Sequence, residues 1–243
     1  MTRNLKVLGL ALVAAFALSA MTASAASAAP ALFTANSHVG NAKIHGGQIG
    51  TDTFTIGALS PLTCATATVS GEGVTAGTSS TYVKLAPTYD TCHIVAPLVG
   101  TRTATVNVEG CTYTVNATKN TTSAPSPGPT PGVATPFSAD LQITCPENQS
   151  IKIHIYNTAN HNHSPAAVLC TFDVGPQTIN NQIQLTNTVT HDVEAHIHAN
   201  VALTSTITGG ICGATVNPTS IYKGVDTLTA TNSEGASVGS TVS

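Results

Sequence analysis

The 243-residue chain contains no tryptophan, only 4% aromatic residues and only 8% charged residues. Its 8 Lys and Arg residues form no basic cluster. We therefore expect no nucleic-acid partner, because such a partner requires a surface that neutralises phosphates. The shortage of aromatic rings argues against a surface that stacks on sugars. A hydrophobic share of 42% excludes a disordered chain, because disordered chains hold too few apolar residues to form a core.

Long apolar runs are missing beyond the N-terminal region, so we expect no transmembrane segment after signal cleavage. In that region, a basic start is followed by the apolar run Val7–Met21 and then by small residues in Ala-x-Ala spacing. A basic start, an apolar run and small residues are the three parts of a secretory signal peptide. Ala25 and Ala28 are alternative cleavage points. We predict a signal peptide over residues 1–28 and a secreted, extracellular mature protein.

Cysteine is present in an even number. All 6 cysteines lie after the predicted signal peptide, and this predicts three disulfides in an exported protein. No Cys-x-x-Cys pair occurs, so a cysteine-based zinc site is not expected. Sequence alone leaves the connectivity open. The closeness of the predicted strands favours three bonds, the last of them by default: Cys92–Cys111, Cys145–Cys170 and Cys64–Cys212.

Apolar and polar residues alternate along most of the chain, as in Thr103–Glu109 and Ile151–Tyr156. Alternation with β-branched residues, broken by Gly, Pro and Asn, is typical of antiparallel strands with one buried face. No segment has a convincing helical period. We therefore predict an all-β fold of one or more antiparallel β-sandwiches, immunoglobulin-like in general architecture and disulfide-bonded.

The clearest break in this pattern is a proline-rich segment that ends at Pro136. Proline cannot join a central ladder, and such a composition gives a stiff spacer. We predict a Pro-rich linker or insertion at residues 123–137, between an N-terminal β-sandwich region over 29–122 and a C-terminal one over 138–243. A linker between two sandwiches is the favoured interpretation, and an excursion from one larger sandwich is the alternative.

Several short segments carry a resemblance to a known group: Leu62-Thr-Cys64, Tyr89-Asp-Thr-Cys92, Glu109-Gly-Cys111-Thr-Tyr113, the spacing of Cys145 and Cys170, and the closing stretch Tyr222–Ser243. On these segments the chain resembles exported, Thr/Gly-rich, disulfide-bonded all-β proteins of unknown function from high-GC Gram-positive bacteria. The resemblance implies a secreted, disulfide-bonded β-protein without an assigned activity. It implies no catalytic residues.

Motifs of enzyme chemistry are missing. The chain has no Gly-x-Ser-x-Gly elbow, no His-Glu-x-x-His and no Walker-type loop. We therefore expect a secreted non-catalytic β-protein of the cell envelope or secretome, without a cofactor, that acts structurally or binds an extracellular partner or envelope component. A hydrolase with an unrecognised site is the least favoured hypothesis.

Histidine is the residue type that stands out. On a strand, His196 and His198 project from one face together with Asp192 and Glu194, and His154 on another predicted strand could supply a third imidazole. Imidazole and carboxylate ligands suit Zn²⁺ or Cu²⁺. The alternative function is therefore a secreted Zn- or Cu-binding protein. The simpler interpretation is that these histidines occupy solvent-facing positions, because the opposite face of the same segment is apolar.

Overall fold

The computed structural model describes residues 31–35, 41–57, 59, 61–75, 79–96, 100–118, 137–157, 168–207, 219–232 and 234–243. The predicted signal peptide, residues 1–28, lies outside the described residues, as does the proline-rich segment up to Pro136. Every regular element of the described part is a β-strand. Within it, no helix is long and apolar enough to cross a membrane.

The strands follow one another with the alternation that the sequence predicts. Their bounds are β1 (Phe33–Ala35), β2 (Asn41–Gln48), β3 (Thr53–Ile56), β4 (Leu62–Thr75), β5 (Ser79–Ser80), β6 (Tyr82–Ala96), β7 (Gly100–Asn107), β8 (Thr112–Thr118), β9 (Phe137–Thr144), β10 (Ile151–Tyr156), β11 (Val168–Val174), β12 (Gln177–Asn187), β13 (Val193–Ala202), β14 (Thr204–Ile207), β15 (Thr219–Thr231) and β16 (Ser240–Val242).

The large sheet closes on itself. Antiparallel pairing runs through β6, β8, β9, β12, β13, β15, β2 and β4, and β4 pairs with β6 again. The prediction of a disulfide-bonded all-β fold is confirmed, but the immunoglobulin-like sandwich is wrong, because these eight strands form a barrel. Alternation along a strand requires only one buried face. It is therefore the same in a sandwich and in a barrel.

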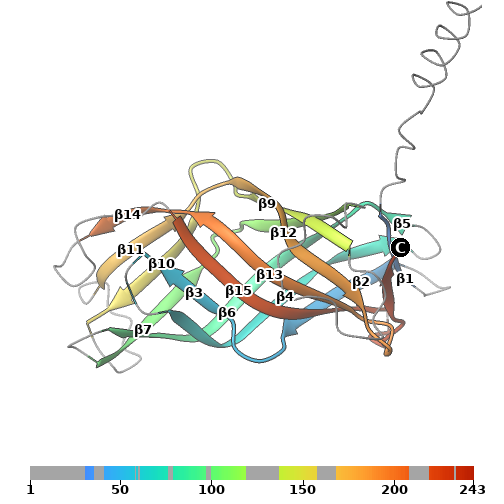
Figure 1. The fold of residues 1–243 in the computed structure, drawn as a ribbon, viewed down its shortest axis with the longest axis horizontal. Helices are drawn as coiled ribbons and strands as arrows, with labels where there is room; N and C mark the ends of the chain where they lie inside the picture. The colour runs from blue at the N-terminus through green and yellow to red at the C-terminus, as the bar shows by residue number, and fades with distance from the viewer. Residues whose placement is uncertain are drawn as a thin grey trace, which may run out of the picture.

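The molecule is elongated, and many of its strands run obliquely to its long axis (Figure 1). Three long strands change partner along their length. β4 pairs with β3 at its start and then with β2. β6 pairs with β8 at Tyr82–Leu85 and with β7 at Cys92–Ala96. β15 pairs with β3 and further on with β2. Strands β7, β10, β11 and β14 extend the sheet at one end of the molecule.

Both sides of the proline-rich segment contribute to this sheet. β8 precedes the segment and pairs with β9, which follows it. The pairs β7–β10 and β2–β15 also join the two predicted ranges, 29–122 and 138–243. Because their strands share one sheet and one core cluster, the described residues do not divide into two separate sandwiches.

The core consists of the inward-facing residues of the barrel. Ile94, Ile183, Leu185 and Val193 are among its most deeply buried side chains. At the end that holds the C-terminus, the small sheet β16-β1-β5 adds Phe33 and other apolar side chains to the core. The hydrophobic effect of this burial is the main force that holds the closed sheet together.

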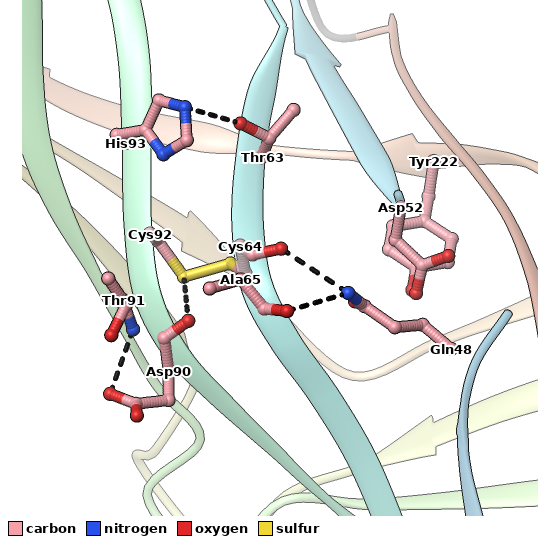
Figure 2. Close-up of a disulfide and its surroundings, with 10 residues drawn as sticks. All are labelled: Gln48, Asp52, Thr63, Cys64, Ala65, Asp90, Thr91, Cys92, His93 and Tyr222. Atoms are coloured by element: carbon pink, nitrogen blue, oxygen red, sulfur yellow. Dashed lines mark hydrogen bonds between the residues drawn. A yellow bond between two sulfur atoms is a disulfide. The ribbon is translucent and has the colours of Figure 1, made fainter. Parts of the chain in front are cut away.

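The two disulfides described in full join neighbouring strands. Cys64 of β4 and Cys92 of β6 are direct partners in the register and are bonded to each other (Figure 2). Cys111 precedes β8, Cys145 follows β9, and these two are also bonded. Cys170 is disulfide-bonded too. The expectation that these cysteines are oxidised is confirmed, but the predicted pairing is wrong.

The register explains why the predicted bonds do not form. β8 pairs with the start of β6, where Leu85 lies opposite Tyr113, whereas Cys92 lies further along β6, directly opposite Cys64 of β4. Seven residues of extended strand, roughly 23 Å, separate Leu85 from Cys92. The observed bonds Cys64–Cys92 and Cys111–Cys145 also exclude the predicted Cys145–Cys170 and Cys64–Cys212, because Cys145 and Cys64 are already paired.

Candidate functional site

The barrel interior contains a cavity of about 110 Å³. Its walls are mostly aliphatic and come from both halves of the chain, with Leu85, Val115, Leu141 and Ile153 among them. A few polar side chains interrupt these walls. Five of them form the interior cluster: Asp52, Tyr89, Tyr113, Tyr222 and Asp226.

The inward face of β15 positions two of these five residues, Tyr222 and Asp226. Tyr222, Gly224 and Asp226 follow one another at every second residue, in phase with the buried Leu228. β3 begins opposite Lys223, so Asp52, one residue earlier, comes to lie over Gly224. A Cβ atom at position 224 would overlap the Asp52 carboxylate. Glycine is therefore what gives this carboxyl group its place inside the barrel.

Asp52 is only 4% exposed, which is unusual for a carboxyl group. The Tyr222 hydroxyl donates a hydrogen bond to its Oδ2 over 2.6 Å, and the two side chains lie together in Figure 2. Its Oδ1 is buried and has no hydrogen-bond partner among the described residues. Burial raises the pKa of Asp52, although the Tyr222 hydroxyl and the Val225 N–H oppose this rise.

Asp226 lies two residues further along the inward face of β15. Burial, and then repulsion by Asp52, raise its pKa to about 7. Among the described residues no histidine, lysine or arginine lines the cavity, so neither carboxyl group has a cationic partner there. A buried charge without a partner is costly, and this makes the pair a candidate functional site.

Gln48 is a neighbour of this pair in the sheet, although it is not one of the residues that line the cavity. It lies directly opposite Asp226 in the β2–β15 register. Its Nε2 donates to the Ala65 carbonyl over 2.9 Å, which fixes the orientation of the amide (Figure 2). Its Oε1 is buried and has no hydrogen-bond partner in the described part of the chain. Within the described residues, Asp52 Oδ1 and Gln48 Oε1, at either end of the β2–β3 turn, thus lack donors.

Two tyrosines complete the interior cluster from other strands. Tyr89 of β6 and Tyr113 of β8 share a hydrogen bond of 3.0 Å between their hydroxyl oxygens. Burial raises the pKa of both phenols, that of Tyr113 to about 12, and the charge of Asp226 contributes in each case. Both therefore stay protonated at neutral pH. Because they interact with Asp226, their hydroxyl groups belong to the same electrostatic site.

The predicted metal ligands lie elsewhere. His196 and His198 alternate with the inward-facing residues of β13, and His154 belongs to β10, which is not a neighbour of β13 in the sheet. His196 Nε2 lies 3.4 Å from Glu194 Oε2, and His198 is paired with Lys223, whose positive charge disfavours a bound cation. Across the described residues, no three His, Cys, Asp or Glu side chains are grouped for metal binding.

The interior cluster was not predicted from the sequence, although one signal was available. Asp226 occupies the phase of β15 that also holds Leu228 and Ala230, so a carboxyl group stands on the apolar face of a strand. Asp52 carries the same signal, because it shares the buried phase of Phe54 and Ile56, but its contact with Gly224 depends on the pairing of β3 with β15. No protein-family model, curated protein or solved structure matches this chain.

Proposed function

We propose that this chain is a secreted, non-catalytic binding protein of the cell envelope or secretome that holds a small, largely apolar ligand inside its barrel. The cavity carries this proposal. Binding sites are typically apolar with a few convergent polar groups and perturbed pKa values, and the interior of an eight-stranded barrel can hold one small ligand. A cavity of about 150 Å³ lined by apolar side chains binds benzene. The present cavity therefore suits a ligand of about that size or slightly smaller.

The lining residues support binding rather than catalysis. Among the described residues they include no histidine to act as a general base, and Cys64, which lines the cavity, is held in a disulfide. No positively charged side chain is present there to stabilise an oxyanion. The secreted location is supported by the signal-peptide pattern and by the disulfides, because disulfides persist in oxidising compartments.

Binding of neutral probes tests the proposed function. Benzene and 1-butanol should each shift the NMR signals of cavity residues in the purified mature protein and should change its tyrosine fluorescence. The chain has no tryptophan and 5 tyrosines, so its intrinsic fluorescence comes from tyrosine, and three of these line the cavity. If benzene, 1-butanol and n-butylamine all fail to bind to the wild-type protein, the proposed function is wrong.

A cavity-filling variant locates the binding. Ala195 is 5% exposed and lines the cavity from β13, so Ala195→Leu should fill part of the space and weaken binding of both probes at least tenfold. Ala202→Leu is the matched control, because it makes the same change on an exposed position of the same strand. It should leave probe affinity unchanged. Equal weakening by both variants would show that the probes bind elsewhere.

A further inference from the structure

We propose that the ligand of the barrel cavity is a small organic cation, an apolar amine whose protonated nitrogen is held between Asp52 and Asp226. This inference rests on the proposed function and names the ligand class of the same cavity. Its starting point is an excess of acceptors over donors at one part of an otherwise apolar wall.

An unpartnered oxygen atom indicates what the ligand must supply. Asp52 lines the cavity, and its Oδ1 is buried without a hydrogen-bond donor in the described residues. Buried polar groups are almost always hydrogen-bonded, so each exception needs an explanation. An ammonium group has three N–H donors and no acceptor, and hydrogen bonds between an ionised donor and a carboxylate are the strong kind. Such a group would supply the donor that Asp52 Oδ1 lacks in the described residues.

Charge points the same way. Asp52 and Asp226 repel each other, and no Lys, Arg or His of the described part lines the cavity to compensate them. A bound cation would attract both carboxylates, and this attraction would offset the cost of burying their negative charge. The Asp52 carboxylate is also kept in position, because it accepts a hydrogen bond from Tyr222 and packs over Gly224.

The rest of the cavity indicates an organic cation rather than a metal ion. Ca²⁺ takes six to eight oxygen ligands and Mg²⁺ needs an octahedral set, whereas the walls beyond the interior cluster are aliphatic. Aromatic rings add to the site, because Tyr222 packs 6.4 Å from Phe54 between ring centroids and both line the cavity. A ring face within reach of a cation attracts it further. An alkyl amine matches this combination of polar and apolar surfaces.

A matched pair of probes tests the inference. n-Butylamine and 1-butanol have nearly the same size and shape, but only the amine is charged at pH 8. We expect n-butylamine to bind the wild-type protein at least tenfold more tightly than 1-butanol, measured by calorimetry and NMR. Asp52→Asn and Asp226→Asn should each remove most of this preference, so that the two probes bind these variants with similar affinity. Asp90→Asn, at an exposed carboxyl group, is the control and should retain the preference.

Acidification is a second arm of the same test. The carboxyl group of Asp226 takes up a proton as the pH falls through about 7, whereas an alkyl amine stays protonated. The groups that face it are Asp52, Gln48, Tyr222 and the Tyr89–Tyr113 pair, and the phenols do not ionise between pH 5.5 and 8. Affinity for n-butylamine should therefore fall severalfold from pH 8 to pH 5.5, and affinity for 1-butanol should not.

The outcomes separate this inference from the proposed function. If 1-butanol binds as tightly as n-butylamine, and Ala195→Leu weakens both, the cavity binds ligands but the cation hypothesis is overturned. It is also overturned if both Asn variants keep the preference for the amine, or if Ca²⁺ binds at the cluster and displaces n-butylamine. If no probe binds at all, the proposed function fails first.

Discussion

Gly224 is the single residue on which the interior cluster most depends. Its lack of a side chain leaves the space that the Asp52 carboxylate occupies, and the neighbouring inward positions of β15 hold Tyr222 and Asp226. The φ angle of Gly224 is not positive, so its backbone is outside the left-handed region and the requirement for glycine is steric. A larger residue would have to displace the carboxylate.

Replacement of this glycine is expected to be costly. Gly224→Ala should lower the free energy of unfolding by roughly 1–3 kcal/mol, the usual cost of overpacking a filled interior, when measured by urea denaturation. In Gly47→Ala the nearest atom to the new Cβ is the Ala67 carbonyl oxygen at 3.6 Å, an ordinary contact. That variant is the control and should be neutral or slightly stabilising. Equal effects in the two variants would contradict the steric role of Gly224.

At the level of elements, the barrel depends on strands that lie far apart in the sequence. β2 and β15 pair although the sequence between them is most of the chain, and β8 pairs with β9 across the proline-rich segment. The bond Cys111–Cys145 joins the ends of β8 and β9 and so spans the same segment. Strand pairing and a disulfide therefore hold the two parts of the chain together independently.

A cut in the proline-rich segment tests this arrangement. A protease site inserted between Pro125 and Pro136 should allow cleavage without release of either part. The cut chain should stay at full mass on a denaturing gel until it is reduced, because Cys111–Cys145 crosses the cut. With Cys111 and Cys145 both replaced by Ala, the two parts should still co-elute in native gel filtration. Two separately eluting folded fragments would instead show independent domains.

At the scale of the whole molecule, charged residues are scarce, so the carboxyl groups of the interior cluster are a notable share of all its charges. The chain has only 11 Asp and Glu residues, and Lys152–Glu109 is a surface ion pair at 2.9 Å of the kind that contributes little. Two of these 11 carboxyl groups lie in the barrel interior with raised pKa values. We therefore expect them to dominate the dependence of global stability on pH.

The sign of this dependence follows from the direction of the shift. The pKa of Asp226 is raised from 3.8 to about 7, so between these values the folded state keeps a proton that the unfolded state loses. Stability should be full below the lower value and should decline as pH rises towards 7, and Asp52 acts in the same direction. A pKa difference of one between the folded and the unfolded state corresponds to about 1.4 kcal/mol, so we expect the free energy of unfolding of the wild-type protein to decline by roughly 2–4 kcal/mol.

Urea unfolding at a series of pH values measures this decline. Asp226→Asn should make the curve flatter between pH 4 and 8 and should be more stable than the wild type at pH 8, because the amide cannot ionise. Asp90→Asn, on an exposed position, serves as the control. A wild-type protein that gains stability from pH 5 to pH 8 would contradict the buried carboxyl pair.

The sequence by itself determined the class of structure. Alternation in segments such as Ile151–Tyr156 predicted strands, and this is confirmed because period two is a local property that each strand carries alone. Oxidised cysteines were also predictable from their number, and the five in the described residues are bonded. The signal peptide over 1–28 remains a prediction, and so does the metal site at His154, His196 and His198.

Only the tertiary structure decided how the strands meet. Closure of the barrel depends on the pairing of β4 with β6, and the partners of Cys64 and Cys111 follow from register, for which no local pattern exists. The candidate site has the same origin, because Asp52 and Asp226 are distant in the chain and meet only where β3 pairs with β15. A strand's own residues determine which face is buried, but the residue across the ladder is chosen by the packing of the whole sheet.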